Sequence, residues 1–192
     1  MTIFECRICL SGLILSLFIV MGFDFFNFQA NSAILNSGIS ERFVNYYWKK
    51  GIKLNNRTIS KVLRAADVCV SNKFSDGPFS SKDFLALAMI ESNFSQYAIG
   101  THGERGIFQI FDYHNELREL NLSNKNIFDI DINVQAACHV LEKKHIIRKD
   151  YYETIISYNG YRKIGNRLND NYWKRFIVAR KVVEDLYGGF ND

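Results

Sequence analysis

The sequence predicts an all-α fold, and three observations indicate it. The 192-residue chain contains one proline and 12 glycines, which leaves room for long helices. Apolar residues recur at steps of three and four, and no stretch alternates for long with a period of two. With 47% hydrophobic and 15% aromatic residues, the chain can bury one sizeable core, so we expect one folded domain and not a disordered chain.

The first 33 residues have the pattern of a targeting segment. Residues 8–23 carry no charge, Arg7 precedes them and small residues follow at 30–33. This order predicts a secretory signal peptide cleaved after Ala33. With the phenylalanines that follow, the apolar part approaches the length of an uncleaved membrane anchor, which stays as the alternative, and a buried core helix is a third. A signal or an anchor would place the rest of the chain in the periplasm or on the extracytoplasmic face of the inner membrane.

Export changes the interpretation of the cysteines. Cys6 and Cys9 fall in the targeting segment, which leaves Cys69 and Cys138. These two could pair in an oxidising compartment, or each could be a small buried residue on a helix, and the sequence leaves both readings open.

Cofactors and nucleic acid are not expected. The four histidines, at 102, 114, 139 and 145, have neither HExxH nor Cys/His spacing, so no zinc site is predicted. The net charge of +4 is small and scattered, without the basic stripe of a nucleic-acid-binding surface.

The domain organisation follows from composition and periodicity. Residues 34–57 mix Asn, Ser and Gly with aromatic residues and are expected to be a linker, followed by a helical domain over 58–187. Ser80 followed by Asp83 resembles a capping box, and Gly188 with the glycine after it is a helix stop signal. Helices are predicted over about 58–73 (with Thr58 as N-cap), 84–91, 132–149, 152–158 and 172–186. The second of these is apolar almost all round, which predicts a central buried helix.

Glu91 ends that apolar helix. A negative charge is disfavoured at a helix C-terminus, and apolar surroundings disfavour the ionised form. Both effects raise the pKa of a carboxyl group, as a general acid working near neutral pH requires. The alternative is a solvated glutamate at a frayed helix end.

The residues after Glu91 favour the catalytic interpretation. Glycines let the backbone approach a bound molecule, and Gln109 offers both a donor and an acceptor to a neutral polar ligand such as a sugar. Here the sequence resembles the lytic transglycosylase family, whose motif has Glu-Ser, a loop with Ala, and Gly-Ala-x-Gly-Leu-Met-Gln. The matching residues are Glu91, Ser92, Ala98, Gly103, Gly106 and Gln109, with Ile107 and Phe108 in place of Leu-Met.

Two later segments extend the resemblance over 58–187. Residues 131–134 look like the family's Asn-Ile helix, although Ala137 and Val140 stand where Gly and Tyr are common. Residues 156–160 match the Tyr-Asn motif of the sugar cleft. The resemblance implies a lysozyme-like helical domain.

The implied reaction is non-hydrolytic cleavage of the MurNAc-GlcNAc β-1,4 bond of peptidoglycan to 1,6-anhydro-MurNAc ends. Glu91 would act first as the general acid and then as the base, without a cofactor or metal. Tyr158 would hydrogen-bond and orient Glu91, Gln109 and Asn159 would hold sugar groups, and Ser92 would anchor the loop and complete the substrate-binding set.

The sequence departs from the family in three places. Gly100 stands where Ser is usual, and Glu104 replaces the usual Ala. The family's Glu-Thr pair on the last helix is absent, and Tyr172, Trp173 and Phe176 occupy that region. These departures affect the detailed shape of the cleft.

Two other functions stay open. Glu104 could activate a water opposite Glu91, as in a lysozyme-type hydrolase, or it could be a salt-bridged or solvated loop residue beside Arg105. A non-enzymatic wall-binding assembly factor is the second alternative.

The expected partners are peptidoglycan glycan strands. The small chain lacks obvious wall-anchoring repeats and therefore resembles the dedicated enzymes that open the wall locally for a secretion or conjugation complex. Residues 8–23 would provide membrane attachment if they are not removed.

Overall fold

The structure, a computed structural model, describes residues 37–160, 163–164, 167–168 and 170–188. The chain divides into two compact units, residues 1–38 and 39–192, and the fold belongs to the second. The predicted signal peptide or anchor, residues 1–33, lies outside the described residues. In the part that the structure describes, no helix is both long and apolar enough to cross a membrane.

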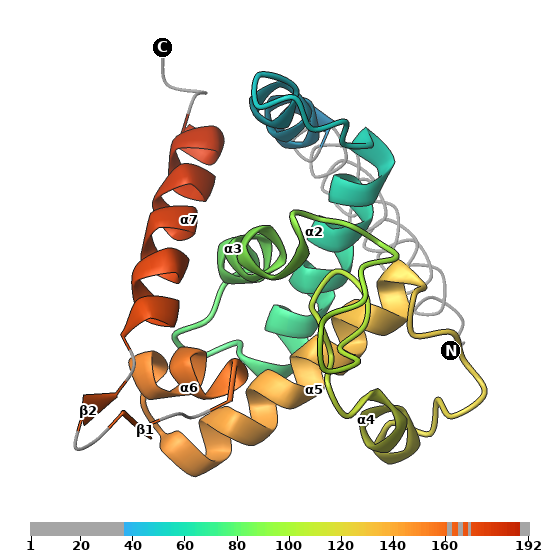
Figure 1. Cartoon of the computed structure of the whole chain (residues 1–192), viewed down its shortest axis with the longest axis vertical. Coiled ribbons are helices and arrows are strands. Elements are labelled where there is room, and N and C mark those ends of the chain that lie inside the picture. The colour runs from blue at the N-terminus through green and yellow to red at the C-terminus, as the bar shows by residue number, and fades with distance from the viewer. Residues whose placement is uncertain (1–36, 161–162, 165–166, 169, 189–192) are drawn as a thin grey trace, which may run out of the picture. The chain divides into compact units, whose positions relative to one another are not determined.

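The described residues are mostly helical, as the sequence predicts (Figure 1). A small antiparallel pair of two-residue strands precedes the last helix, with Lys163 opposite Leu168 and Ile164 opposite Arg167. After a helical stretch over 37–48, the elements are α2 (Asn56–Lys73), α3 (Ser81–Ser92), α4 (Tyr113–Glu119), α5 (Ile130–Arg148), α6 (Tyr151–Tyr158), β1 (Lys163–Ile164), β2 (Arg167–Leu168) and α7 (Asn171–Gly188).

The predicted helices exist within a few residues of their expected bounds. The first begins earlier than expected because Asn55, and not Thr58, is its N-cap, with the Asn55 side chain accepting from Arg57 N–H. Asp129 and Asp150 cap α5 and α6 in the same way. The short helix α4 was not expected, because it buries only Glu116 and Leu117 and shows too few apolar residues to reveal a period.

Helix α3 is the centre of the core. It packs between α2 and α7 (Figure 1). Its residues 84–88 are all 0% exposed, which confirms the prediction from their apolar character. The remaining contacts extend this core, with α5 against α2, α4 and α6, and α6 against α7.

The start of α3 is held by a buried polar network around Asp83. The predicted capping box is present: the Asp83 carboxylate accepts from Ser80 N–H at 2.7 Å. Its other oxygen accepts from the Tyr151 hydroxyl and from Arg180 Nε, both at 2.7 Å. Asp83 is only 1% exposed, so these partners from α6 and α7 offset the cost of burying its charge.

Residues 37–48 are not the linker that the composition predicts. They are helical, and Ile39, Phe43 and Tyr47 are at most 1% exposed. These residues are four apart and therefore share one face of the helix. The rings of Phe43 and Tyr47 pack edge-on against Phe94, just beyond the end of α3. The Asn- and Ser-rich composition concealed this stripe, which becomes buried only against Phe94 and the rest of the core.

Cys69 of α2 and Cys138 of α5 form a disulfide, with their Cα atoms 6.1 Å apart. The sequence left open whether these cysteines pair or are separate buried residues, and in the structure they pair. The bridge joins two neighbouring helices across 69 residues of chain and so restricts the unfolded chain considerably.

The bridge gives a stability prediction. Replacing both cysteines with alanine, Cys69→Ala with Cys138→Ala, should lower the free energy of unfolding by about 2–4 kcal/mol, because the unfolded chain regains conformational freedom. Urea unfolding with and without a reducing agent provides the measurement. The double variant should be insensitive to reductant, and an unmodified protein that is equally insensitive would contradict the bridge.

Candidate active site at the end of the central helix

The chain turns sharply after Glu91. Asn93 and Phe94 both adopt positive φ angles, 51° and 61°, and Phe94 N–H donates to the carbonyl of Ala88 at 3.2 Å. Phe94 is buried, and it is the residue on which the aromatic side chains of helix 37–48 pack. This turn fixes Glu91 in the last turn of α3, at the edge of the core.

Asn133 of α5 holds in place, by hydrogen bonds, the glycine-containing loop that follows α3. Its Oδ1 accepts from Phe108 N–H at 2.9 Å, and its Nδ2 donates to the carbonyls of Arg105 at 3.1 Å and Ile127 at 3.0 Å. Gly106 has a φ of 79°, and a Cβ there would collide with the Asn133 amide. Only glycine therefore lets the loop approach Asn133 this closely. Asn133 belongs to the sequence motif of residues 131–134, but the motif alone gave it no role.

Ser92 and Gln109 also stabilise the loop. The Ser92 hydroxyl donates to the carbonyl of Ile107 at 2.7 Å, so Ser92 anchors the loop as expected. The Gln109 amide nitrogen donates to the carbonyls of Gly106 at 2.8 Å and Ala98 at 3.3 Å. Since these contacts use the Gln109 donor, its Oε1 is the atom left to accept a hydrogen bond from a ligand.

A cleft of about 550 Å³ lies beside Glu91. Four of the predicted site residues line it: Glu91, Gln109, Tyr158 and Asn159. Ser92 is not among the lining residues and contacts the loop through the carbonyl of Ile107. The other lining residues come from the loop, from the end of α6 and from α4 and α5: Gly100, Thr101, His102, Glu104, Ile110, Phe111, Asp112, Glu116, Val140, Lys144 and Gly160.

Burial governs the acidity of Glu91. It raises the pKa of the carboxyl group, and the nearby Glu104 raises it further. A hydrogen bond from the Tyr172 hydroxyl at 2.5 Å and the positive charge of Arg175 lower it. The result is a pKa of about 7, against an ordinary value of 4.5. Glu91 can therefore give up and take back a proton near neutral pH.

Tyr158 does not orient Glu91 as the resemblance implied. Its hydroxyl donates to the carbonyl of Phe108 at 2.9 Å, while Tyr172 donates to Glu91. Burial and then the nearby Glu91 carboxylate raise the pKa of Tyr158, so Tyr158 lies close to the acid without binding it. Tyr172 stands 81 residues from Glu91 in the sequence, in the region where the family's Glu-Thr pair is missing, and only the packing of α7 on α3 reveals its role.

Glu104 shares the cleft with Glu91 but has the opposite electrostatic character. Its carboxylate accepts from His102 N–H at 2.9 Å and lies 3.2 Å from His102 Nδ1. Partial burial would raise the pKa of Glu104, but the hydrogen bonds from backbone N–H groups and from His102 leave it below its ordinary value. The contact of Glu104 is thus with His102, and the guanidinium of the neighbouring Arg105 lies 4.8 Å from the centre of the Tyr113 ring.

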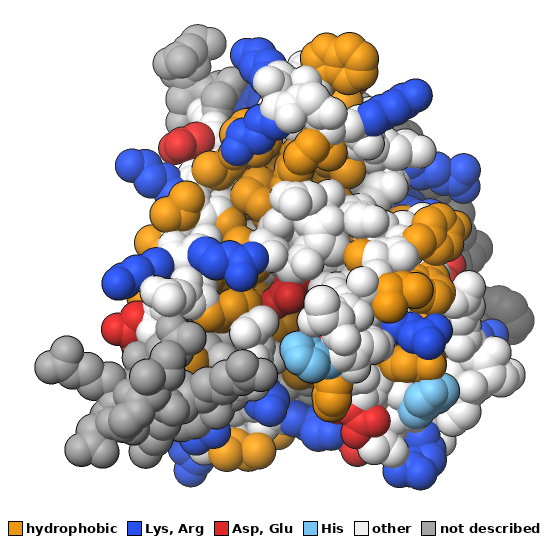
Figure 2. Space-filling view, viewed as in Figure 1, with side chains coloured by type: hydrophobic (Ala, Val, Ile, Leu, Met, Phe, Trp, Pro, Cys, Tyr) orange, Lys and Arg blue, Asp and Glu red, His pale blue; other side chains and the backbone are white. Residues whose placement is uncertain are grey.

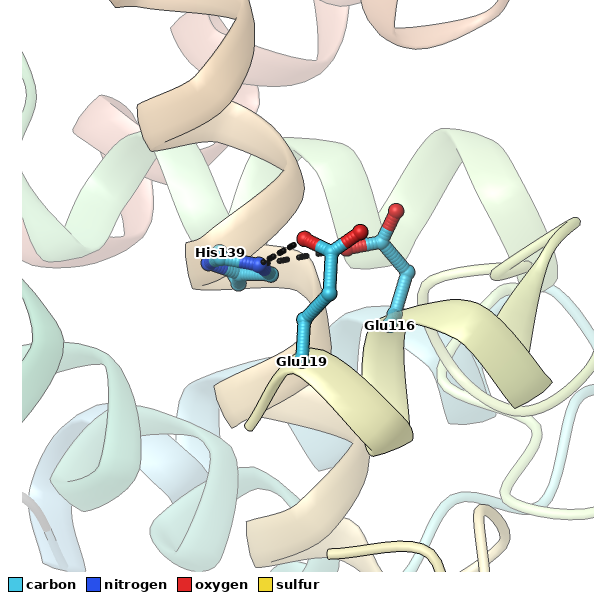
Figure 3. Close-up of side chains that lie close together, drawn as sticks. All are labelled: Glu116, Glu119 and His139. Carbon is cyan, nitrogen blue, oxygen red and sulfur yellow. Dashed lines mark hydrogen bonds and ion pairs between the residues drawn. The ribbon is translucent and has the colours of Figure 1, made fainter. Parts of the chain in front are cut away.

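A charged cluster crosses from α4 to α5 next to the cleft. Figure 3 shows Glu116 and Glu119 pointing toward His139. These three side chains bring one potential metal-ligand atom each within 4.8 Å of one another. The ammonium of Lys143 contacts Glu119 at 2.9 Å and Glu116 at 3.4 Å, so a cation is already supplied by the protein. We interpret the cluster as an ion network that joins the two helices; it has no sequence motif because its members come from separate elements.

These features define the class of protein. An acid with a pKa near neutrality, placed at the end of a central helix and facing a polar cleft, is what a lysozyme-like glycan-cleaving domain requires. The family model of the transglycosylase SLT domain matches residues 76–178, which include α3, α4, α5, α6 and part of α7. The chain belongs to this family, whose members are lytic transglycosylases that act on peptidoglycan. No curated protein and no solved structure gives a significant match.

The Tyr172 contact predicts a change in the pH dependence of activity. In Tyr172→Phe the hydrogen bond that stabilises the ionised carboxylate is lost, so the pKa of Glu91 should rise above about 7. The alkaline limb of kcat/KM against pH on peptidoglycan should then move to higher pH, and kcat should fall because Glu91 is less well oriented. The matched control is Tyr152→Phe, which removes a hydroxyl that donates to Asp170. An unchanged alkaline limb in Tyr172→Phe would argue against the contact.

The raised pKa of Glu91 also predicts a stability change. Between the ordinary pKa of 4.5 and about 7, the unfolded chain releases this proton while the folded protein retains it, so stability falls as pH rises through that range. Glu91→Gln removes the titrating group and should raise the free energy of unfolding by about 3 kcal/mol at about pH 8. At about pH 4 the variant and the unmodified protein should differ little from each other. Urea unfolding at both pH values is the measurement, with the exposed Glu41→Gln as control, and an equal effect at both pH values would contradict the buried acid.

Proposed function

We propose that Glu91 cleaves the MurNAc-GlcNAc β-1,4 bond of peptidoglycan without consuming water. The observation that carries this proposal is a single carboxyl group, with a pKa of about 7, that is held by Tyr172 at the wall of the cleft. Such a group is protonated often enough to act as an acid and is deprotonated easily enough to act as a base.

The reaction has two halves, and Glu91 serves in both. In the first, Glu91 gives its proton to the glycosidic oxygen as the bond to C1 of the muramyl sugar breaks, and the sugar's own N-acetyl oxygen stabilises C1. In the second, the Glu91 carboxylate removes the proton from the 6-hydroxyl of the same sugar, and that oxygen bonds to C1. The products are a GlcNAc hydroxyl and a 1,6-anhydro-MurNAc end, and Glu91 recovers its proton.

The residues around Glu91 suit this sequence of steps. Tyr172 donates to one oxygen of the carboxyl group and so fixes its direction. Gln109 Oε1 is free of the contacts that occupy the Gln109 nitrogen, and Asn159 is exposed at the end of α6, so both can meet sugar groups. Tyr158 and Ser92 support the loop through the carbonyls of Phe108 and Ile107. We therefore assign Ser92 and Tyr158 to the support of the binding surface.

A lysozyme-type hydrolase is the second candidate, and Glu104 favours it. Glu104 lines the same cleft, and its lowered pKa keeps it ionised while Glu91 is protonated. This is the pairing of an acid with a base that an inverting glycosidase uses, with a water molecule between the two carboxyl groups. The hydrogen bonds to His102 hold Glu104 on the loop, which supports a role other than activating water.

The cellular setting is also a proposal. Residues 1–33 have the pattern of an export signal or anchor, which would bring the domain to the periplasm or the extracytoplasmic face of the inner membrane. A small domain without wall-anchoring repeats suits local opening of the wall for a secretion or conjugation complex.

Two glutamate substitutions and an analysis of products separate the functions. Glu91→Gln keeps the shape of the side chain but cannot transfer a proton, so the rate of release from purified peptidoglycan should fall roughly 100- to 10,000-fold. Glu104→Gln should cost little in a transglycosylase, because the attacking hydroxyl is part of the sugar itself. Mass analysis should find 1,6-anhydro muropeptides, lighter by one water than the products of a lysozyme.

Other outcomes would replace the proposal. Reducing-end products together with an inactive Glu104→Gln would identify a hydrolase. Peptidoglycan that is bound but not cleaved by the unmodified protein would identify the non-enzymatic assembly factor.

A further inference from the structure

The cleft is the acidic part of a basic chain. Its titratable lining consists of Glu91, Glu104, Asp112 and Glu116 against Lys144 and His102, whereas the chain as a whole has a net charge of +4. With Glu91 protonated and Glu116 paired to Lys143, the carboxylates of Glu104 and Asp112 remain, beside the one lysine, Lys144. On the face shown in Figure 2, Lys and Arg side chains are widely spread and acidic side chains are few. The lining of the cleft therefore carries a larger share of acidic side chains than the chain as a whole.

Gly100 allows two acceptor oxygens to approach each other inside this cleft. A Cβ at position 100 would collide with Oε2 of Glu104 and would lie 2.7 Å from Oε1 of Gln109. The Glu104 carboxylate thus occupies the space that a side chain at position 100 would fill. Gln109 directs its oxygen to the same place because its nitrogen is held by the loop. The two departures from the family therefore depend on each other: Glu104 in place of Ala fits in this position only because Gly100 stands in place of Ser.

The two neighbouring acceptor oxygens, Glu104 Oε2 and Gln109 Oε1, are suited to binding a hydrogen-bond donor of a ligand. Glu104 Oε2 accepts from His102 N–H, but an ionised carboxylate can accept about four hydrogen bonds, so it retains capacity. An amide oxygen and a carboxylate oxygen side by side favour an N–H donor that carries positive charge, since charge-assisted hydrogen bonds are about twice as strong as neutral ones. In a glycan of amino sugars, that donor is the free 2-ammonium group of a sugar that has lost its N-acetyl group.

We propose that Glu104 and Gln109, brought together by Gly100, form a binding position for the 2-ammonium group of a de-N-acetylated glucosamine in the glycan strand. This inference rests on the proposed function, because it assigns a substrate preference to the same cleft. It is compatible with the reaction, in which the assisting N-acetyl group belongs to the muramyl sugar and is retained. Glu104 then determines specificity and is not the catalytic base of a hydrolase.

Binding to short glycans tests the inference without depending on cleavage. Full-length protein carrying Glu91→Gln is titrated calorimetrically with a tetramer of N-acetylglucosamine and with the fully de-N-acetylated tetramer. We expect the de-N-acetylated tetramer to bind about tenfold more tightly, and Glu104→Gln added to this background to remove the preference. Glu41→Gln, which removes an exposed charge on helix 37–48, should leave the preference unchanged.

The geometry is tested at Gly100. Gly100→Ala places a methyl group in the space of Glu104 Oε2 and should reduce the preference while Glu104 is present. In a Glu104→Ala background the same change should have no further effect on the preference. The matched control is Gly77→Ala, whose methyl group would meet Phe74 at an ordinary distance of 3.4–3.5 Å.

The outcomes separate this inference from the proposed function. A preference that is absent, that survives Glu104→Gln, or that responds additively to the Gly100 and Glu104 changes overturns the binding position. Loss of cleavage in Glu91→Gln and the anhydro products test the reaction alone, and each result can hold while the other fails.

Discussion

A carboxyl group can be kept at the edge of a protein core only where hydrogen bonds and neighbouring charges offset its loss of hydration. Helix α3 imposes this requirement, because residues 84–88 are completely buried and the helix leads directly to Glu91. Residues of α7 offset this loss of hydration. Tyr172 donates to the Glu91 carboxylate, and Arg175 donates to the carbonyl of Ile90 at 2.6 Å. At the other end of α3, Asp83 binds Arg180, also from α7. Burial raises the pKa of Glu91, and the contacts from α7, which lies along α3, hold the carboxyl group in place and limit that rise.

The loop over the cleft depends on a different contact, between Asn133 and the backbone around Gly106. Asn133 donates and accepts, so one side chain forms hydrogen bonds with three backbone groups, those of Arg105, Phe108 and Ile127. Because Asn133 lies on α5, the loop is held by the helix that the disulfide ties to α2. The position of Gln109 relative to Glu91 is therefore set by the packing of α2, α3 and α5 and not by the loop alone.

The two carboxyl groups in the cleft, those of Glu91 and Glu104, have pKa values shifted in opposite directions by their surroundings. Glu91 loses hydration and has a raised pKa, whereas Glu104 gains hydrogen bonds from His102 and has a lowered one. In the network of Glu116, Glu119, His139 and Lys143 at the α4–α5 side, Lys143 offsets part of the negative charge of the two glutamates. The same residue type thus has a raised pKa in one place and a lowered pKa in another, and forms part of a helix contact in a third.

The sequence by itself determined the helical class, the central helix, its capping box and the placement of Glu91, because these follow from local periodicity and from residues near one another in the chain. Gln109, Tyr158 and Asn159 were also predicted to share the site, and they line the cleft with Glu91. Helix 37–48 was missed, since its stripe of Ile39, Phe43 and Tyr47 has meaning only once Phe94 and the core are present. Tyr172, the closeness of Glu104 to Gly100 and the pairing of Cys69 with Cys138 were decided by the tertiary structure alone. The Tyr172 contact and the disulfide depend on the docking of separate helices, and the closeness of Glu104 to Gly100 depends on how one loop folds and where the side chain points. The spacing of residues along the chain encodes none of these.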